Sequence, residues 1–201
     1  MNVPNEINAQ PKIKLAILAS GTGSNADKIC LYFRDHPNIS VDLIISNNIN
    51  AGVLNVAASH HIESIVTPKS SWKSPEIVLP EIRTREITHI VLAGFLLLLP
   101  EWLVKEYKGR IINIHPALLP KHGGPGMYGQ HVHESVKSAG DLISGITIHE
   151  VDEHYDEGDI IFQKKIELLP TDTTDEIAKK VLQIEHQYYS EIIEQWSMKM
   201  I

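Results

Sequence analysis

The sequence predicts one α/β domain of three layers, in which a mainly parallel β-sheet lies between helices and an antiparallel strand follows in the C-terminal half. Three observations lead to this fold class. Short apolar runs alternate with helical segments, a rhythm typical of strand–helix–strand units. A glycine loop follows the first apolar run, and the second half changes to strands with polar positions joined by an acidic loop.

The first half of the chain contains five expected strands, each a short apolar run without a helical stripe. Such runs are typical of parallel strands that are covered on both faces. The expected strands span residues 14–19, 41–46, 64–66, 89–93 and 110–114, and the expected helices between them span 25–34, 51–60 and 75–86. Since crossover connections are right-handed, these helices should cover both faces of the sheet.

The second half is expected to begin with a glycine-rich loop over residues 121–129, mobile and placed over a site. It continues with a helix over 130–139, strands over 145–151 and 159–166 joined by the acidic segment 152–158, and a long helix over 174–196. Residues 171–174 have the composition of a helix cap, with acidic residues in the following turn. Residues 1–12 are expected to form a disordered arm, and residues 13–201 one domain.

Composition excludes several classes of protein. A net charge of -7 argues against a nucleic-acid-binding protein, because phosphate binding needs a basic face. Cys30 is the only cysteine, so no disulfide can form within the chain, and a reducing cytoplasm is the expected location. The longest apolar run, residues 90–99, is interrupted by Gly94 and is far shorter than the roughly 20 residues that span a bilayer. A soluble chain without a membrane partner is expected.

Two polar side chains interrupt the expected strand that ends before Pro116. Asn113 and His115 lie two positions apart, so they should point to the same face of the strand. An amide donor beside an imidazole at a strand end suits a reaction in which a carbonyl oxygen gains negative charge. The alternative interpretation is a solvated strand end with a hydrogen-bonded core histidine.

The segment 20–25, with sequence SGTGSN, joins the first strand to the first helix. Backbone N–H groups and a helix N-terminus converge on an anion in this arrangement. Gly21 and Gly23 allow a ligand to approach the backbone, while Ser24 and Asn25 add side-chain donors. The loop lacks the third glycine of a dinucleotide fingerprint and the Gly-Lys-Ser/Thr of a P-loop. A phosphate site and an ordinary tight turn both remain open from the residues alone.

A histidine that acts near neutral pH benefits from a carboxylate neighbour, which raises its pKa. Candidates are present in and beside one acidic loop, and spacing does not choose among them: Asp152, Glu153, Asp156, Glu157 and Asp159.

At this point a family resemblance becomes specific. Five blocks in this order resemble the phosphoribosylglycinamide formyltransferases, also called glycinamide ribonucleotide transformylases, of the formyltransferase superfamily. They are SGTGSN at 20–25, LAGF at 92–95, NIHPALLP at 113–120, GITIH at 145–149 and DEGDII at 156–161. The resemblance extends from Lys14 to Trp196. It implies a Rossmann-like fold and a formyltransferase domain over residues 13–201.

The resemblance also implies roles for residues. Asn113 and His115 match the catalytic asparagine and histidine, and Asp156 matches the aspartate that raises the pKa of that histidine. The implied ribonucleotide site contains Gly23, Ser24 and Asn25 at the phosphate and Glu185 near the ribose. The implied folate site contains Leu96, Leu97, Leu98 and Leu99, whose backbone reads the pteridine of 10-formyltetrahydrofolate, together with Asn113. Residues 152–156 close its far side.

The implied reaction transfers the formyl group of 10-formyltetrahydrofolate, a co-substrate, to the amine of N1-(5-phosphoribosyl)glycinamide in de novo purine biosynthesis. Asn113 and protonated His115 stabilise a tetrahedral intermediate, Asp156 assists, and neither a metal nor a covalent enzyme intermediate is required. The expected partners are small-molecule substrates, and the expected assembly is a monomer or a homodimer.

This sequence departs from the family pattern at several positions. Leu97 lies where a basic residue is common, and Leu182 where some members have a glutamine, which a leucine cannot replace as a hydrogen-bonding group. The loop 122–129 is longer than in many relatives. Lys73 is a candidate for a basic residue that some members use.

Three other functions are open. A formyltransferase acting on an amino sugar nucleotide would share Asn113, His115 and Asp156. A noncatalytic nucleotide-binding module would use the glycine loop but leave these polar groups unexplained. A metal hydrolase could use His131, His133, His149 and His154 with the acidic loop. It would need His131 and His133 to point together, whereas side chains two positions apart on a helix diverge.

Overall fold

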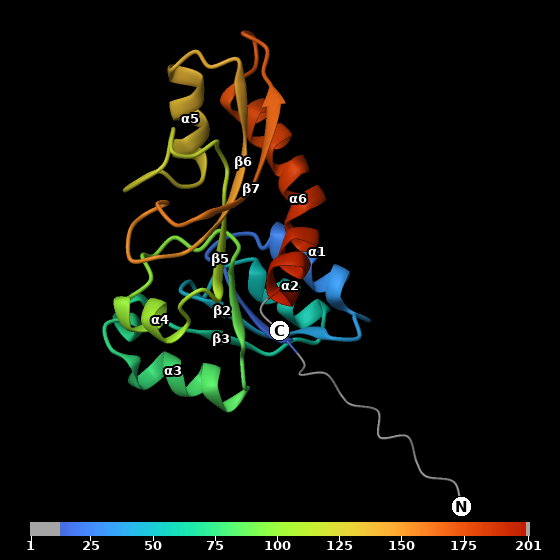
Figure 1. Cartoon of the computed structure of the whole chain (residues 1–201), viewed down its shortest axis with the longest axis vertical. Helices are drawn as coiled ribbons and strands as arrows, with labels where there is room; N and C mark the ends of the chain where they lie inside the picture. Colours follow the sequence, from blue (N-terminus) through green and yellow to red (C-terminus); the bar gives the residue numbers. More distant parts are fainter. Residues whose placement is uncertain (1–12, 200–201) are drawn as a thin grey trace, which may run out of the picture.

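The computed structural model describes residues 13–199, which form a seven-stranded sheet between two layers of helices (Figure 1). The strands are β1 (Ile13–Leu18), β2 (Ile39–Ser46), β3 (Ser64–Val66), β4 (His89–Leu92), β5 (Ile111–His115), β6 (Ile143–Glu150) and β7 (Ile160–Glu167). The helices are α1 (Ser24–Phe33), α2 (Val53–Ser59), α3 (Pro75–Thr84), α4 (Glu101–Glu106), α5 (Gln130–Ser138) and α6 (Thr174–Met198), with a 3-10 turn at Lys69–Trp72.

The sheet has the order β3-β2-β1-β4-β5-β6-β7. The first five strands are parallel, and β6 pairs in the antiparallel sense with both β5 and β7. The predicted fold class, a mainly parallel sheet with an antiparallel strand in the C-terminal half, is therefore confirmed.

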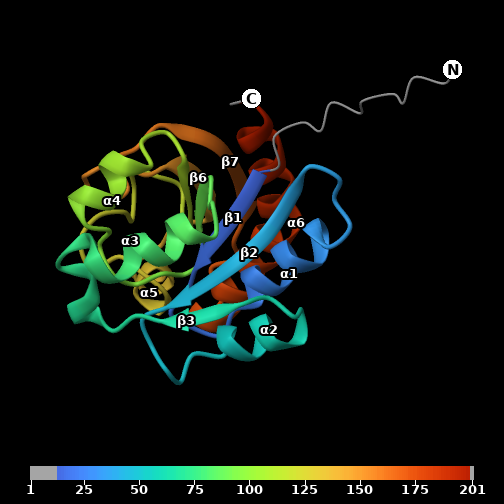
Figure 2. The ribbon, with the colours of Figure 1, turned by 90° about the horizontal axis from the view of Figure 1, so that it is seen from below.

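Apolar side chains alternate between the two faces of the central strands. Leu15 and Ile17 pack in the core under α1 and α6, and their neighbours Ala16 and Leu18 pack in the core under α3 and α4. Figure 2 shows these two pairs of helices on opposite sides of β1 and β2. Because both faces of the strands are buried, the sequence of each strand is a continuous apolar run.

The long helix α6 has a capped N-terminus and a hydrogen bond that fixes it to the sheet. Its first turn carries a capping box, in which Thr173 and Glu176 satisfy each other's backbone N–H groups. Farther along, the fully buried Tyr189 donates its hydroxyl to the Leu92 carbonyl at 2.8 Å. A buried phenol needs such a partner, so this contact aligns α6 with the strand ends that form the site.

The expected elements match the observed ones except in two places. The sequence interpretation placed neither α4 nor the 3-10 turn, because each is too short to show a helical repeat. The segment 121–129 is irregular, as expected. The predicted disordered arm at residues 1–12 lies outside the described residues. No helix within residues 13–199 is long and apolar enough to cross a membrane.

Candidate active site

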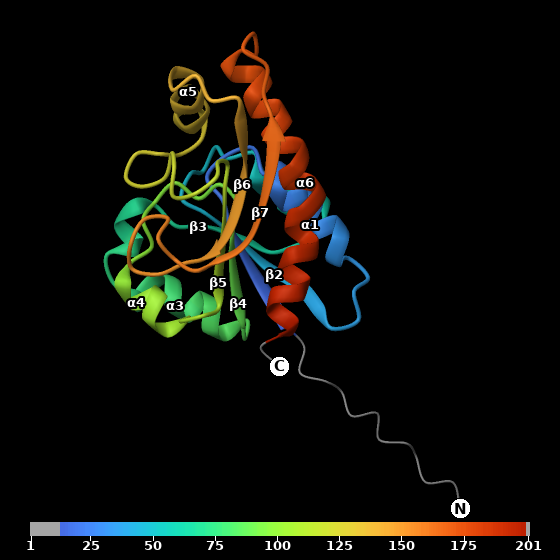
Figure 3. The same ribbon diagram turned by 45° about the horizontal axis from the view of Figure 1, so that its top comes forward.

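The site lies at the carboxyl ends of β1, β4 and β5. In a parallel sheet these ends meet at one edge, and the loops that leave them converge there. Ser20, after β1, joins two of these loops because its N–H donates to the Gly94 carbonyl at 3.0 Å and its hydroxyl accepts the Leu96 N–H at 2.9 Å. Figure 3 shows two further loops, from β5 to α5 and from β6 to β7, projecting from the same side of the sheet.

These loops and α6 enclose a cavity of about 560 Å³. It brings together the predicted catalytic residues Asn113, His115 and Asp156. It also contains Ser24, Asn25, Leu96 and Glu185 from the predicted ligand sites. Residues that sequence reasoning did not assign complete the lining, notably Thr22, Tyr128 and His133.

His115 is the last residue of β5 and is only 3% exposed. Its Nε2–H donates to the His122 carbonyl at 2.9 Å, and its Nδ1 lies 3.6 Å from Asp156 Oδ2. Burial lowers the pKa of His115, while the Asp156 carboxylate and the His122 carbonyl act in the opposite direction. Asp156 thus acts in the predicted sense, but burial outweighs it and the pKa of His115 lies below its ordinary value.

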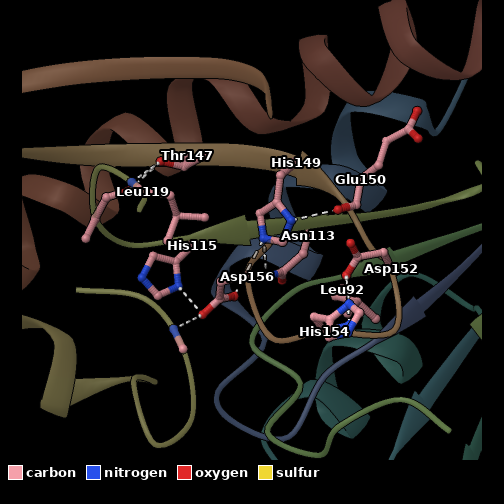
Figure 4. Close-up of polar contacts among 12 residues, drawn as sticks. Leu92, Asn113, His115, Leu119, Thr147, His149, Glu150, Asp152, His154 and Asp156 are labelled. Carbon is pink, nitrogen blue, oxygen red and sulfur yellow. Dashed lines mark hydrogen bonds and ion pairs between the residues drawn. The ribbon is translucent and has the colours of Figure 1, made fainter. Parts of the chain in front are cut away.

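Asp156 belongs to the β6–β7 loop, and its carboxylate lies between the side chains of His115 and His149 (Figure 4). Its Oδ1 is 3.7 Å from His149 Nε2, and its Oδ2 accepts the Gly124 N–H at 2.9 Å. Asp156 has a positive φ of 56°, a conformation that costs a non-glycine residue free energy. The loop 121–129 and the acidic loop 152–158 therefore hold each other next to His115.

Asn113 is oriented by His149, which lies directly opposite it in the β5–β6 pair. His149 Nδ1–H donates to the Glu150 carbonyl at 2.7 Å, so its Nε2 is the acceptor in the neutral ring. The Asn113 amide nitrogen, 3.1 Å from that Nε2, is consequently the atom that faces His149. One amide N–H is used by this bond, and the second remains for a ligand in the cavity.

Two residues of β6 were missed as site residues by sequence reasoning. His149 appeared only in the block 145–149 of the family resemblance and as a candidate metal ligand, and Thr147 only in that block. Thr147, opposite His115, donates to the Ala117 carbonyl at 2.7 Å and accepts the Leu119 N–H at 2.9 Å, which fixes the turn after His115. The period-two pattern of Gly145, Thr147 and His149 was the signal, since it places three non-apolar residues on one face of a strand.

The loop 20–25 leads from β1 into the N-terminus of α1, as the sequence predicts. Gly23 precedes α1 with a φ of +84°, and a Cβ there would approach Val53 Cα to 2.7 Å. Glycine is therefore required both by backbone conformation and by packing. Asp27 N–H bonds the Gly23 carbonyl, whereas within residues 13–199 the N–H groups of Ser24 and Asn25 have no acceptor.

Asn25 links this loop to α6. Its amide nitrogen donates to Glu185 Oε2 at 2.7 Å, and its buried Oδ1 has no hydrogen-bond partner within residues 13–199. Burial raises the pKa of Glu185 to about 7. Leu182 also lines this part of the cavity and supplies no hydrogen-bonding group.

The four predicted folate-site leucines are in different environments. Leu96 is 46% exposed and lines the main cavity, whereas Leu98 and Leu99 line a neighbouring hollow of about 340 Å³ with Glu153 and His154. Leu97 packs on the core and Leu99 is buried in it. The Leu96 N–H is already bonded to Ser20, while the N–H groups of Leu97 and Leu98 are not used by any hydrogen bond within residues 13–199.

Of the remaining candidates, Lys73 lies apart from the cavity, whereas His133 lines it. Lys73 is exposed at the end of the 3-10 turn and does not line the cavity. On α5, His131 is exposed while His133 is buried, so the two side chains diverge as expected for helical positions i and i+2. Within residues 13–199, no group of three or more His, Cys, Asp or Glu side chains is arranged to hold a metal ion.

The fold and the site together indicate an α/β enzyme in which Asn113, His115 and Asp156 share one cavity with the loop 20–25. The family model described as formyl transferase matches residues 13–193. The chain therefore belongs to the formyl transferase family and, by the relatives described next, to its phosphoribosylglycinamide formyltransferases. The predicted family is confirmed.

Three relatives illustrate this similarity. The chloroplastic phosphoribosylglycinamide formyltransferase of Arabidopsis thaliana is 41% identical over 186 residues, covering 90% of this chain and 64% of the plant protein. The Bacillus subtilis phosphoribosylglycinamide formyltransferase is 35% identical, covering 90% of this chain and 93% of the relative. A crystal structure of the enzyme from Anaplasma phagocytophilum has a TM-score of 0.83 at 32% identity, covering 90% of this chain and 85% of that one. The chain thus spans slightly less than two thirds of the plant relative.

Proposed function

We propose that this protein transfers the formyl group of 10-formyltetrahydrofolate to the amine of N1-(5-phosphoribosyl)glycinamide, a step of de novo purine biosynthesis. The observation that carries the proposal is the convergence of Asn113, His115 and Asp156 on a cavity that also contains the anion-binding loop. The relatives named above are phosphoribosylglycinamide formyltransferases, which supports the same acceptor.

The reaction forms one C–N bond and breaks another. The neutral amine of the acceptor attacks the formyl carbon, giving a tetrahedral intermediate with a negatively charged oxygen. The free N–H of the Asn113 amide and the imidazolium of His115 stabilise this oxygen. The intermediate collapses when the bond to N10 of the folate breaks, and the proton lost by the amine is delivered to N10.

The low pKa of His115 in its buried position fits this mechanism. Before reaction, burial favours the neutral imidazole, which leaves the site without an unpaired buried cation. As negative charge develops on the formyl oxygen, both it and Asp156 favour protonation of His115, which takes the proton lost by the attacking amine and passes it to N10 when the bond to N10 breaks. Protonation of His115 is therefore most favourable in the tetrahedral intermediate. In this way the residue stabilises the intermediate more than the bound substrate.

The acceptor binds with its phosphate at residues 23–25. The free N–H groups at the N-terminus of α1 and the positive end of its dipole favour an anion there. The unpaired Asn25 Oδ1 and the Glu185 carboxyl lie next along the cavity and suit the ribose hydroxyls. This order places the glycinamide end of the acceptor near Asn113 and His115.

The folate binds across Leu96 to Leu99, with residues 152–156 opposite. The unused N–H groups of Leu97 and Leu98 supply donors to the heteroaromatic ring, and the leucine side chains supply an apolar surface. Since backbone groups do this work, the leucine at 97 does not prevent binding.

An acceptor comparison tests the proposal. The purified chain is supplied with 10-formyltetrahydrofolate and, in separate reactions, with N1-(5-phosphoribosyl)glycinamide or a UDP-linked amino sugar, each with and without EDTA. We expect formyl transfer to the glycinamide ribonucleotide alone, at the same rate in EDTA. Transfer only to the amino sugar, or loss of activity in EDTA that a divalent ion restores, contradicts the proposal.

A further inference from the structure

His122 occupies an unusual position after β5. It has a positive φ of 59°, a conformation that a non-glycine residue adopts only when its surroundings impose it. Its imidazole is largely buried and uses both nitrogens: Nδ1 lies 2.8 Å from Ser135 Oγ, and Nε2 lies 2.8 Å from Asp141 Oδ2. The ring is therefore clamped between α5 and the turn that follows it.

The backbone next to this ring contacts both members of the catalytic pair. The His122 carbonyl accepts the Nε2–H of His115 at 2.9 Å, and two residues later the Gly124 N–H donates to Asp156 Oδ2 at 2.9 Å. A three-residue segment thus fixes the proton on Nε2 of His115 and directs Nδ1 toward Asp156. Any rotation of the peptide at His122 would disturb both contacts.

The charges around the ring favour the clamped arrangement. Hydrogen bonds from Lys121 and His122 lower the pKa of Asp141, so its carboxylate is ionised and accepts from His122 Nε2–H. His122 Nδ1 then accepts the Ser135 hydroxyl proton, which defines one tautomer for the neutral ring. Ser135, His122 and Asp141 do not line the substrate cavity, so the cluster acts on the site through the backbone and not on a substrate.

We propose that Ser135, His122 and Asp141 form a positioning cluster that holds the His122 backbone in its left-handed conformation and thereby sets the tautomer and orientation of the His115–Asp156 pair. The inference rests on the proposed function, since it assigns positioning residues to the same reaction. It predicts that the ring of His122 matters to catalysis without touching a substrate.

Three variants and one control test the cluster. His122→Ala removes both clamps, and His122→Gly removes them while making the left-handed backbone easy to adopt. Ser135→Ala removes one clamp only. Ser138→Ala, the same change one turn later at an exposed position of α5, is the matched control.

The first readout is steady-state kinetics with both substrates. For His122→Ala and His122→Gly we expect kcat to fall roughly 10- to 100-fold, because small displacements of catalytic groups have effects of this size, with KM little changed. Ser135→Ala should show a smaller decrease in kcat in the same direction, and Ser138→Ala should match the wild type. Full activity of His122→Gly would show that the backbone conformation suffices and would overturn the role of the ring.

The second readout is an NMR titration of His115 with selectively labelled histidine, in the absence of substrates. The groups that face His115 are Asp156, His149, His122 and His133. Because the His122 carbonyl favours the protonated ring, its displacement should lower the pKa of His115 in the His122 and Ser135 variants and leave it unchanged in Ser138→Ala.

The titration separates the two proposals. If the wild type lacks formyl transfer but the His115 shift appears, the proposed function fails and the positioning cluster stands. If the wild type is active but Ser135→Ala and the His122 variants keep both the wild-type kcat and the wild-type titration, the cluster is merely structural and the inference is wrong. Ser135→Ala decides the question even if the His122 variants do not fold.

Discussion

Asn113 and His149 face each other across β5 and β6, with the amide nitrogen of one 3.1 Å from Nε2 of the other. The histidine tautomer fixes which end of the amide faces it, and so directs an N–H into the cavity. The orientation of the proposed catalytic donor, Asn113, is thus set by strand register and by one bond from His149 to the Glu150 carbonyl. His115 is likewise oriented by its neighbours, because Nε2–H donates to the His122 carbonyl and Nδ1 faces Asp156.

Removal of the Asn113 donor tests its part in the reaction. We expect Asn113→Ala to lower kcat by about 10²- to 10³-fold, equivalent to about 3 to 4 kcal/mol of transition-state stabilisation. KM for the glycinamide ribonucleotide should change little, because the acceptor phosphate binds elsewhere. A kcat within a few-fold of the wild type would remove Asn113 from the oxyanion site.

The support from His149 predicts a smaller effect of the same kind. His149→Phe keeps an aromatic ring of similar width but leaves the Asn113 amide without its acceptor. We expect kcat to fall less than in Asn113→Ala, and the double variant to be no worse than Asn113→Ala alone, because both changes remove one interaction. Independent, additive losses in the double variant would show that His149 acts by another route.

The substitution Asp156→Asn keeps the shape of the side chain and removes its negative charge. Since the carboxylate raises the pKa of His115 against burial, its loss lowers that pKa further. The proposed reaction needs the imidazolium, so the decline of kcat with rising pH should begin at lower pH in the variant. The kcat–pH profile and an NMR titration of His115 measure this directly, and an unchanged profile at the wild-type rate would exclude Asp156 from the role.

Because Glu185 is a buried carboxyl group, we expect the stability of the protein to fall as pH rises toward neutrality. Its pKa is raised by burial to about 7, above the value of the unfolded chain, so the folded state binds the extra proton. The contribution of Glu185 to the free energy of unfolding is therefore fully present at pH values below its pKa in the unfolded chain. As pH rises through its folded-state pKa of about 7, this contribution is lost, on the order of 3 kcal/mol. Glu185→Gln should remove most of this dependence in urea unfolding between pH 5 and 8.

A control for that experiment lies on the same helix. Glu191 is exposed on α6, so Glu191→Gln should leave the pH dependence of unfolding as in the wild type. If Glu185→Gln behaves like Glu191→Gln, the burial of the Glu185 charge is not the cause of the dependence.

The loop 20–25 contains two glycines that allow a matched pair of variants. Gly23→Ala places a Cβ 2.7 Å from Val53 Cα in a residue with positive φ, whereas a Cβ at Gly21 meets no atom of residues 13–199 within 4 Å. We expect Gly23→Ala to lower Tm and to raise KM for the glycinamide ribonucleotide, since the loop and the start of α1 must shift. Gly21→Ala should have nearly the wild-type Tm, and equal Tm values for the two variants would contradict the packing argument.

The sequence predicted the parts of the fold that depend on burial along the chain. Strands β1, β2, β4 and β5 are covered on both faces, so each appears as an apolar run, and the pair Asn113 and His115 was visible because two polar residues interrupt one such run. The short helix α4 was missed because six residues show no repeat. Asp156 could be selected from five acidic residues only through the family resemblance.

The roles of the supporting residues could not be assigned from the sequence, because each role depends on tertiary geometry. His149 becomes a partner of Asn113 only through the register of β5 with β6. His122 becomes important through a left-handed backbone conformation, which its residue type does not signal. The lowered pKa of His115 depends on the depth of its burial, which a strand-end position does not specify.

The central claim is that Asn113 and His115 together stabilise the oxyanion of a formyl transfer to the glycinamide amine. The most direct measurement follows ¹³C-labelled formyl from 10-formyltetrahydrofolate by NMR, in the presence of N1-(5-phosphoribosyl)glycinamide, for the wild type and an Asn113→Ala/His115→Ala double variant. We expect the label to appear on the glycinamide nitrogen with the wild type, and with the folded double variant no faster than without protein. Undiminished transfer by the double variant, or no label on the glycinamide with the wild type, would contradict the account.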